Sequence, residues 1–175
     1  MTETTTSRSE AIERLKARDP RLGPWQAFLT AHALVTRRLD DDLRSEQGMT
    51  LAEYAALLQL ANAPGRRLRM NQLADGIILS RSGVTRLIDR LEAEGLVARS
   101  QCTSDGRGAE AVLTELGYGR LRQASRTHLR GIKAYFLDQV AEDDLVAIER
   151  SCGAVGRGVR TGDRRTTATE DRRSA

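Results

Sequence analysis

The sequence predicts a mainly α-helical fold with a small β-wing, in which a winged helix-turn-helix is joined to a helical dimerisation domain. Aromatic residues make up only 3% of the 175 residues, while 30% are charged. The core must therefore consist mostly of Leu, Val, Ile and Ala, which is typical of helical proteins. Several long segments repeat apolar residues at the 3.6-residue period of a helix. Two short strand-like runs flank an Asp-Gly pair, which indicates a hairpin.

The charge of the chain favours an anionic partner. The formal net charge is +4 and the pI is about 9.6, but basicity alone does not separate nucleic acid from an acidic membrane surface. No apolar run approaches the roughly 20 residues of a membrane span. The start, MTETTTSRSE, has neither the basic nor the apolar region of a signal peptide. We therefore expect a cytoplasmic protein that does not associate with membranes.

Enzymatic, metal and cofactor chemistry have little support in the sequence. Cys102 and Cys152 lie far apart without CxxC spacing or clustered histidines, so we predict neither a disulfide framework nor a metal site. The chain has no glycine-rich phosphate loop and no nucleophile with a base at recognisable spacing. We expect no cofactor and no enzymatic activity.

Five segments follow from the pattern of apolar residues. Residues 1–20 are polar and are predicted to form a flexible N-terminal arm. Residues 21–48 are predicted to form a dimerisation helix, with Pro24 in its first turn and Gly48 at its end. One face of this helix carries a stripe of large side chains: Trp25, Phe28, Leu29, His32, Val35, Leu39 and Leu43. Residues 49–113 are predicted to form the winged helix-turn-helix.

The C-terminal part is predicted to contain further dimerisation helices. Residues 114–157 form long amphipathic helices, although Gly117 and Gly119 weaken the first turns. These stripes and that of residues 21–48 are too long and apolar to be covered within one small subunit, so we expect a homodimer. Residues 158–175 lack apolar periodicity and are predicted to form a disordered basic tail.

Capping residues set the boundaries of the central segment. Thr50 and Glu53 have the spacing of a capping box at a helix start, and the run RLRM at 67–70 suits a small strand. Asn71 is the expected N-cap of a short helix that ends in a turn at 76–79. Ser80 caps a second helix, and Gly95 suits the left-handed conformation that follows a helix end. The two helices and their turn predict a helix-turn-helix.

The second of these helices has one apolar and one polar face. Its buried stripe is predicted to be Val84, Leu87, Ile88 and Leu91. Ser82, Arg86 and Asp89 point the opposite way, with Arg81, Thr85 and Arg90 on the flanks. A face of this width fits the major groove of DNA, where arginine forms paired hydrogen bonds to guanine and Ser or Thr can bond to base edges. The amides near Ser80 favour a phosphate.

The hairpin that follows is predicted to be a wing. The runs LVARSQC and AEAVL flank TSDGRG, so Arg107 lies between two glycines and can enter a narrow minor groove. Asp105 can accept hydrogen bonds from an arginine and fix the loop. Arg69, beside the short strand, either faces solvent or contacts phosphate. The residues that we expect to bind DNA are Ser80, Arg81, Ser82, Thr85, Arg86, Arg90, Asp105, Arg107, Arg69 and Asn71.

The order of these motifs resembles that of the MarR family of bacterial regulators. The matching runs are LSRSGVTRLIDRLEAEGLVAR, SDGRG and AVLTELG, and the resemblance extends over residues 25–155. It implies a triangular dimer whose winged domains each read half of a palindromic operator. It also implies a small-molecule effector or oxidant that binds between the dimer helices and the reading domain and releases the DNA. Peroxide-sensing relatives carry a cysteine where this chain has Trp25 and Phe28.

Two alternatives stay open at this point. Trp25, Phe28 and His32 are candidates for an effector pocket, although their positions also suit the core of a dimer interface. The winged domain could also serve as a protein- or ligand-interaction module without a specific operator, because fold does not fix function. The leading hypothesis is a repressor that binds its operator as a homodimer.

Overall fold

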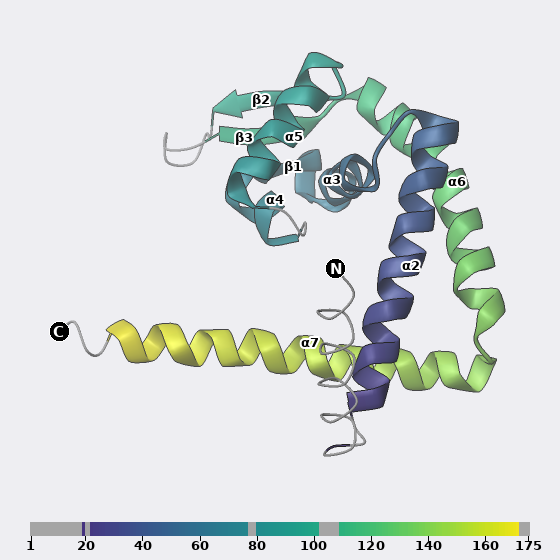
Figure 1. Cartoon of the computed structure of the whole chain (residues 1–175). Coiled ribbons are helices and arrows are strands. Elements are labelled where there is room, and N and C mark those ends of the chain that lie inside the picture. Colours follow the sequence, from purple (N-terminus) through teal and green to yellow (C-terminus); the bar gives the residue numbers. More distant parts are fainter. Residues whose placement is uncertain (1–18, 20–21, 77–79, 102–108, 172–175) are drawn as a thin grey trace, which may run out of the picture. The chain divides into compact units, whose positions relative to one another are not determined.

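A computed structural model describes residues 19, 22–76, 80–101 and 109–171, which fall in two compact units, 1–132 and 133–175 (Figure 1). The elements of the first unit are α2 (Leu22–Gln47), α3 (Leu51–Asn62), η1 (Pro64–Arg66), β1 (Arg67–Arg69), α4 (Met70–Gly76), α5 (Arg81–Ala93), β2 (Val97–Gln101), β3 (Ala109–Leu113) and most of α6 (Glu115–Tyr135). The second unit holds η2 (Leu137–Gln139) and α7 (Glu142–Asp171). The mainly helical fold with a small sheet confirms the predicted fold class.

The three strands form an antiparallel sheet in the order β1-β3-β2. In the β2–β3 hairpin, Val97 pairs with Leu113 and Gln101 pairs with Ala109. On the other side of β3, Leu68 pairs with Ala111. The hairpin confirms the two predicted strand runs. Its connecting segment, with the predicted wing residues Asp105 and Arg107, lies outside the described residues.

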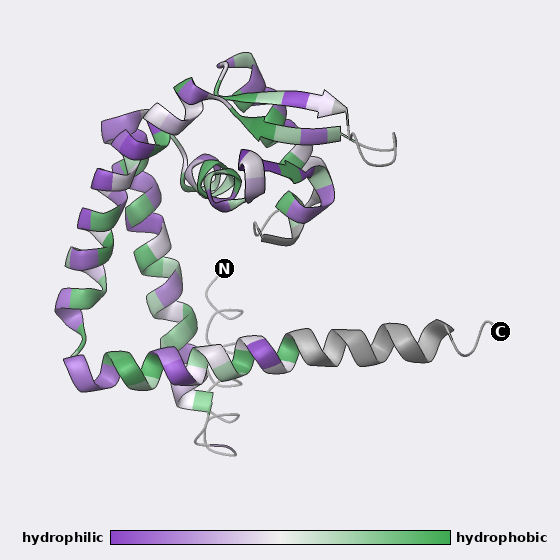
Figure 2. Cartoon of the chain, turned by 180° about the vertical axis from the view of Figure 1, so that it is seen from behind, coloured by the Kyte–Doolittle hydropathy of each residue, from purple (hydrophilic) through white to green (hydrophobic). Residues whose placement is uncertain are grey.

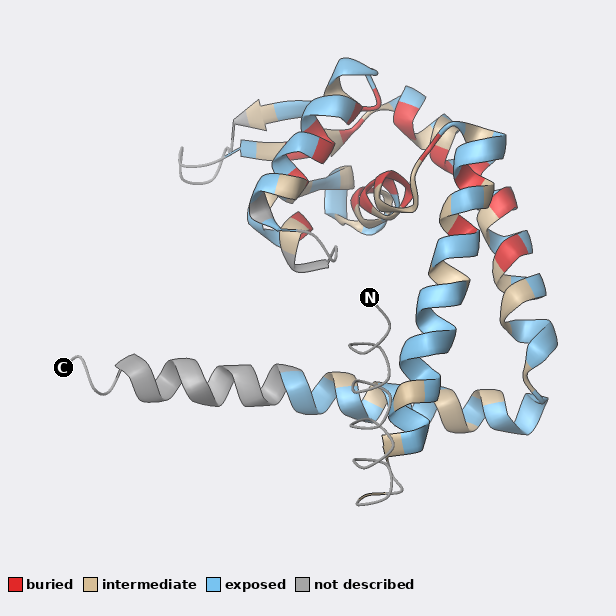
Figure 3. Ribbon diagram, viewed as in Figure 1, coloured by how far each residue is buried: buried red, intermediate tan, exposed pale blue. Residues whose placement is uncertain are grey.

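The core gathers between α3, α4, α5 and the sheet, as the buried positions show (Figure 3). The predicted stripe of α5 is buried as expected, because its apolar residues recur on one face of the helix. The side chains that are least accessible to solvent include Leu57, Leu60, Leu73, Ile88 and Leu91. This core fixes the position of α5 and turns its polar face outward.

Helices α2 and α6 lie side by side at the end of α2. The Nη2 atom of Arg120 donates to the Gln47 carbonyl at 2.6 Å, and Gln47 Nε2 donates to the Thr127 hydroxyl at 3.0 Å. Thr127 in turn donates to Glu46 Oε2 at 2.9 Å, and Arg130 pairs with the same carboxylate. Thr127 is buried, and its hydroxyl is therefore satisfied on both sides.

Most of the predicted helix boundaries agree with the structure. Thr50 forms the full capping box with Glu53, and Ser80 caps α5 by accepting a hydrogen bond from the Gly83 amide at 3.1 Å. Gly48 and Gly95 follow helix ends with φ of 61° and 71°, a left-handed conformation that glycine adopts without steric cost.

The predicted N-cap at Asn71 is wrong. Helix α4 begins at Met70, directly after β1, so Asn71 lies inside its first turn. The Arg69 amide instead donates to Gln72 Oε1 at 3.0 Å. A glutamine at the third helical position thus satisfies the exposed amide of the capping residue from the helix side.

The end of the chain also differs from the sequence-based expectation of a disordered tail at 158–175. Helix α7 continues through Asp171. No proline follows Glu142 in the sequence, and extending an existing helix costs far less than starting one, because each added residue gains a hydrogen bond. The lack of apolar periodicity therefore does not end the helix at Gly158.

Candidate nucleic-acid interface

The N-cap and first half of α5, residues 80–86, include the exposed polar residues Ser80, Ser82, Thr85 and Arg86, and we call this segment the presenting half. Ser82 and Arg86 are exposed on the side opposite the buried stripe, and Thr85 is exposed on its flank. Ser80 caps the helix and also contacts Ser82 through their hydroxyls at 3.1 Å. Among the described residues, Arg86 has no ion-pair partner, so its guanidinium can reach a ligand. Arg81 is the first residue of α5.

The second half of α5, residues 89–92, carries charged side chains that hold the helix in place, and we call it the anchored half. Asp89 pairs with Arg99 of β2, and Glu92 Oε2 lies 3.3 Å from Arg99 Nη1. The Arg99 amide also donates to Glu92 Oε1 at 3.2 Å. These contacts fasten α5 to the wing hairpin.

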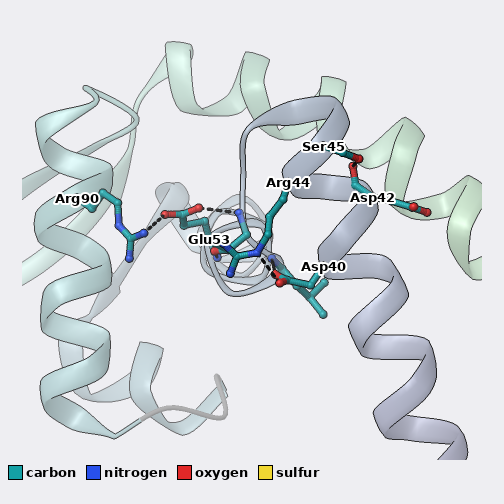
Figure 4. A network of polar contacts seen from close by, with 8 residues as sticks. Asp40, Asp42, Arg44, Ser45, Glu53 and Arg90 are labelled. Atoms are coloured by element: carbon teal, nitrogen blue, oxygen red, sulfur yellow. Dashed lines mark hydrogen bonds and ion pairs between the residues drawn. The ribbon is translucent and has the colours of Figure 1, made fainter.

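Arg90 connects the anchored half to α3. Its Nη1 lies 3.1 Å from Glu53 Oε1, and the Glu53 side chain is only 7% exposed (Figure 4). The sequence places Arg90 on the flank of the DNA-reading face, but the structure turns its guanidinium toward Glu53. The capping spacing identifies Glu53 as a helix cap, whereas nothing in the sequence indicates its pairing with α5, which lies far along the chain.

The arginines around β1 have different surroundings. Arg66 lies over the Tyr118 ring at 4.1 Å and donates to Glu115 Oε1 at 2.7 Å, so it packs against α6. Arg67 Nη1 lies 3.8 Å from Glu110 Oε2. Arg69 and Asn71 are exposed beside β1 and at the start of α4. The structure therefore brings Ser80, Ser82, Thr85 and Arg86 together on α5 and its N-cap, with Arg69 and Asn71 on neighbouring elements, whereas Arg90 turns to Glu53.

The predicted effector residues form an aromatic row on α2. The ring centroids of Trp25 and Phe28 lie 6.0 Å apart, and those of Phe28 and His32 lie 6.2 Å apart. Trp25 and Phe28 are about half exposed in the single chain. A cavity of about 460 Å³ lies elsewhere, on α6, and is lined by Gly119, Arg122, Gln123, Ser125 and Arg126.

The second histidine of the chain, His128, lies on α6 and packs against α3. The His128 ring centroid lies 4.3 Å from that of Tyr54, and the Tyr54 and Ser125 hydroxyls are 3.3 Å apart. Burial lowers the pKa of His128, because it penalises the charged imidazolium. The buried Nδ1 atom has no hydrogen-bond partner among the described residues.

Two further features bear on the kind of site. Within the described ranges, His, Cys, Asp and Glu side chains nowhere gather in a group able to hold a metal ion. The helices in the same part of the chain are all too short or too polar to cross a membrane.

Comparison with known proteins finds similar chains among bacterial regulators. The family model described as MarR family matches residues 47–108. The structure of AbsC, a MarR family transcriptional regulator from Streptomyces coelicolor, is 32% identical, with a TM-score of 0.74 over 82% of this chain and 96% of AbsC. Sco3205 from the same organism, solved in complex with DNA, is 31% identical with a TM-score of 0.74, over 81% of this chain and 92% of Sco3205.

A curated relative is also named for its function. The HTH-type transcriptional repressor YetL from Bacillus subtilis (strain 168) is 31% identical over 88 residues, which cover 50% of this chain and 53% of YetL.

Proposed function

This chain belongs to the MarR family of transcriptional regulators, and from that premise we propose that it represses transcription as a homodimer on a palindromic operator. Members of the family are transcriptional regulators, so the chain is a regulator and not an enzyme. YetL, a relative, is named a repressor, which favours repression over activation. A protein that acts on the bacterial chromosome works in the cytoplasm.

The presenting half of α5 is the observation that carries this proposal. Arg86 is exposed and has no ion-pair partner in the described part of the chain, and it lies one helical turn from Ser82. Arginine can form two hydrogen bonds to the O6 and N7 atoms of guanine, and Ser and Thr can reach neighbouring base edges. The buried opposite face fixes the direction in which these side chains point.

Dimerisation has support from α2. Trp25, Phe28 and Leu29 are 53%, 49% and 44% exposed in the single chain, and hydrophobic positions recur along the helix (Figure 2). Exposed apolar residues grouped on one helix face mark an interaction surface. A twofold dimer presents two recognition helices in symmetric positions, which fits a palindrome.

The wing and the arginines beside it complete the proposed interface. We place Arg107 in the minor groove and Asp105 as its hydrogen-bond acceptor, both from sequence, because this loop lies outside the described residues. Arg69 and Asn71 would contact the backbone of the duplex beside β1.

Release by a small-molecule effector is part of the proposal. Trp25 is the single tryptophan of the chain and stacks on Phe28, so its fluorescence would report a ligand bound at the aromatic row. A screen of small aromatic and apolar compounds should find one that both changes this fluorescence and releases bound DNA. If compounds that release DNA leave Trp25 fluorescence unchanged, the effector site is elsewhere.

The main experiment is selection of duplexes from a random-sequence pool by the full-length protein. We expect enrichment of an inverted repeat whose half-sites are spaced by about one helical turn of DNA. Enrichment of no sequence would contradict the operator and favour the alternative, an interaction module. Fusion of the selected duplex to a promoter should then reduce transcription when the protein is present, and increased transcription would contradict repression.

A further inference from the structure

Glu53, in the first turn of α3, has a carboxylate that contacts both the start of α3 and a residue of α5. Glu53 is 5% exposed, and its Oε2 atom accepts a hydrogen bond from the Thr50 amide at 2.7 Å. Its Oε1 atom faces Arg90 Nη1 at 3.1 Å. The same side chain therefore caps α3 and binds a residue of α5.

A second carboxylate reaches the same turn from α2. Asp40 Oδ1 accepts a hydrogen bond from the Leu51 amide at 2.7 Å, and Asp40 Oδ2 accepts one from Arg44 at 2.6 Å (Figure 4). The neighbouring amides of Thr50 and Leu51, at the start of α3, are thus bound by two carboxylates. Asp40 belongs to α2, and Glu53 contacts Arg90 of α5. The turn connects the predicted dimerisation helix with the helix that presents Arg86.

The burial of Glu53 determines where Arg90 points. A buried carboxylate without a cationic partner is strongly disfavoured. The Arg44 guanidinium, also near Glu53 in Figure 4, donates to Asp40. If Arg90 turned to a DNA phosphate, the charge of Glu53 would lose its 3.1 Å partner. The structure therefore favours Arg90 on Glu53 over Arg90 on a phosphate.

We propose that Glu53 and Arg90 are a specificity-determining pair that sets the orientation of α5 in the major groove. Arg90 is a positioning residue in this pair and does not contact phosphate. Paired hydrogen bonds to a base tolerate little displacement, so a small rotation of α5 moves Arg86 out of register. This inference rests on the proposed function, because it concerns how the protein discriminates between duplexes.

The test compares Glu53→Gln, Arg90→Gln and the double variant. Glutamine at 53 keeps an oxygen for the Thr50 amide but removes the charge that binds Arg90, so the cap is retained. For each protein we would measure affinity for the duplex selected by the wild type and for a mixed-sequence duplex of equal length. The ratio of the two affinities cancels the general effect of a changed net charge, and a salt series gives the number of phosphate contacts.

We expect both single variants to lower this ratio by roughly 2- to 30-fold, and the double variant to lower it no further. The slope of log affinity against log salt should stay unchanged in Arg90→Gln. Two results together would overturn the proposal and make Arg90 a phosphate contact. They are a salt slope smaller by about 0.9 in Arg90→Gln and an unchanged affinity ratio in Glu53→Gln. If the wild type selects no duplex, the proposed function itself fails, which is a different result.

Two controls separate positioning from folding. Thr50→Ala removes the other half of the capping box and should lower the melting temperature without changing the affinity ratio. Arg122→Gln removes an exposed charge from α6 and should leave the ratio at the wild-type value. Should Arg90→Gln fold poorly, Arg90→Lys keeps a cation near Glu53 and should retain most of the discrimination. An equal loss of discrimination in Thr50→Ala would overturn the specific role of the pair.

Discussion

A Cβ atom placed on Gly117 would lie 2.0 Å from the carbonyl oxygen of Leu96. The first turn of α6 docks at this point on the segment that follows α5. The Thr114 amide donates to the same Leu96 carbonyl at 3.1 Å, and the Gly117 amide donates to the Thr114 hydroxyl at 3.0 Å. The turn approaches the winged domain so closely that only glycine fits at position 117.

Replacing Gly117 by alanine should therefore destabilise the protein despite the higher helix propensity of alanine. The methyl group would also lie 2.9 Å from Leu113 Cδ1. We expect a loss of about 1 to 3 kcal/mol in the free energy of unfolding, measured by urea denaturation. Gly119→Ala is the matched control, since nothing lies within 4 Å of its added Cβ. It should gain up to about 1 kcal/mol, and equal effects of the two variants would contradict the close contact.

These two glycines show which features of the fold can be predicted from sequence. Periodicity identifies the buried stripe of α5, and capping rules identify Thr50 and Ser80, because both depend on residues close in the chain. The same local rules treat Gly117 and Gly119 alike. The difference between them arises from Leu96, which approaches only in the folded chain.

The residues of the candidate site also divide into those that local sequence rules predict and those that depend on tertiary packing. The exposed positions of Ser82, Thr85 and Arg86 follow from the helical period. The pairing of Arg90 with Glu53 does not, because it depends on how α3 and α5 pack. The sequence also misplaces the cap of α4 at Asn71, because the side-chain oxygen of Gln72, inside the helix, accepts from the Arg69 amide.

Asp40→Ala should weaken the attachment of α3 to α2. Its carboxylate binds the Leu51 amide and Arg44, and a hydrogen bond to a charged group in a partly exposed position contributes about 1 to 2 kcal/mol. Urea denaturation at neutral pH should show a loss of that size. Asp41→Ala, at the exposed neighbouring position, should change the free energy of unfolding little. Equal losses would show that the effect comes from helix charge and not from the Leu51 contact.

The contribution of Asp40 should also depend on pH. Burial alone would raise the pKa of the Asp40 carboxyl, but hydrogen bonds from Arg44 and the Leu51 amide outweigh it and lower the pKa below 3.8. The stabilisation is therefore present above pH 3.8 and disappears as the pH falls through the lowered pKa of the folded state. The difference between wild type and Asp40→Ala should shrink only in strong acid.

His128 should make the fold less stable as the pH falls from neutral. Burial lowers its pKa below the ordinary value of 6.5, so the unfolded chain binds a proton there more readily than the folded chain. The free energy of unfolding is then largest above pH 6.5 and decreases as the pH drops below it. Denaturation between about pH 8 and about pH 5.5 should show this slope, and His128→Gln should remove it. His32→Gln, which changes the other histidine, should keep it.

Arg86→Ala should lose sequence discrimination. Its exposed side chain lies in the presenting half of α5, and one paired contact to guanine contributes about 1 to 3 kcal/mol of discrimination against the wrong base. Gel-shift measurements on the selected duplex and its single-base variants should show a loss of that size at one position in each half-site. Arg122→Ala, which removes an exposed charge from α6, should leave the discrimination between these duplexes unchanged. Undiminished discrimination by Arg86→Ala would remove this residue from the interface.

Phe28→Glu should separate the two subunits of the proposed dimer. Phe28 lies between Trp25 and His32 in the aromatic row of α2 and is 49% exposed in the single chain. A second subunit that covers this row would bury the glutamate charge, which should cost about 3 kcal/mol or more, near a hundredfold in the dissociation constant of the dimer. Sedimentation at micromolar concentration should then detect monomers.

Thr30→Glu is the control for this change, because it adds the same charge to the opposite side of α2. It should leave the dimer intact while shifting the net charge equally. A wild-type protein that sediments as a monomer would contradict the dimer directly. Dissociation by both variants alike would instead show that charge repulsion along α2, and not burial of the Phe28 face, separates the subunits.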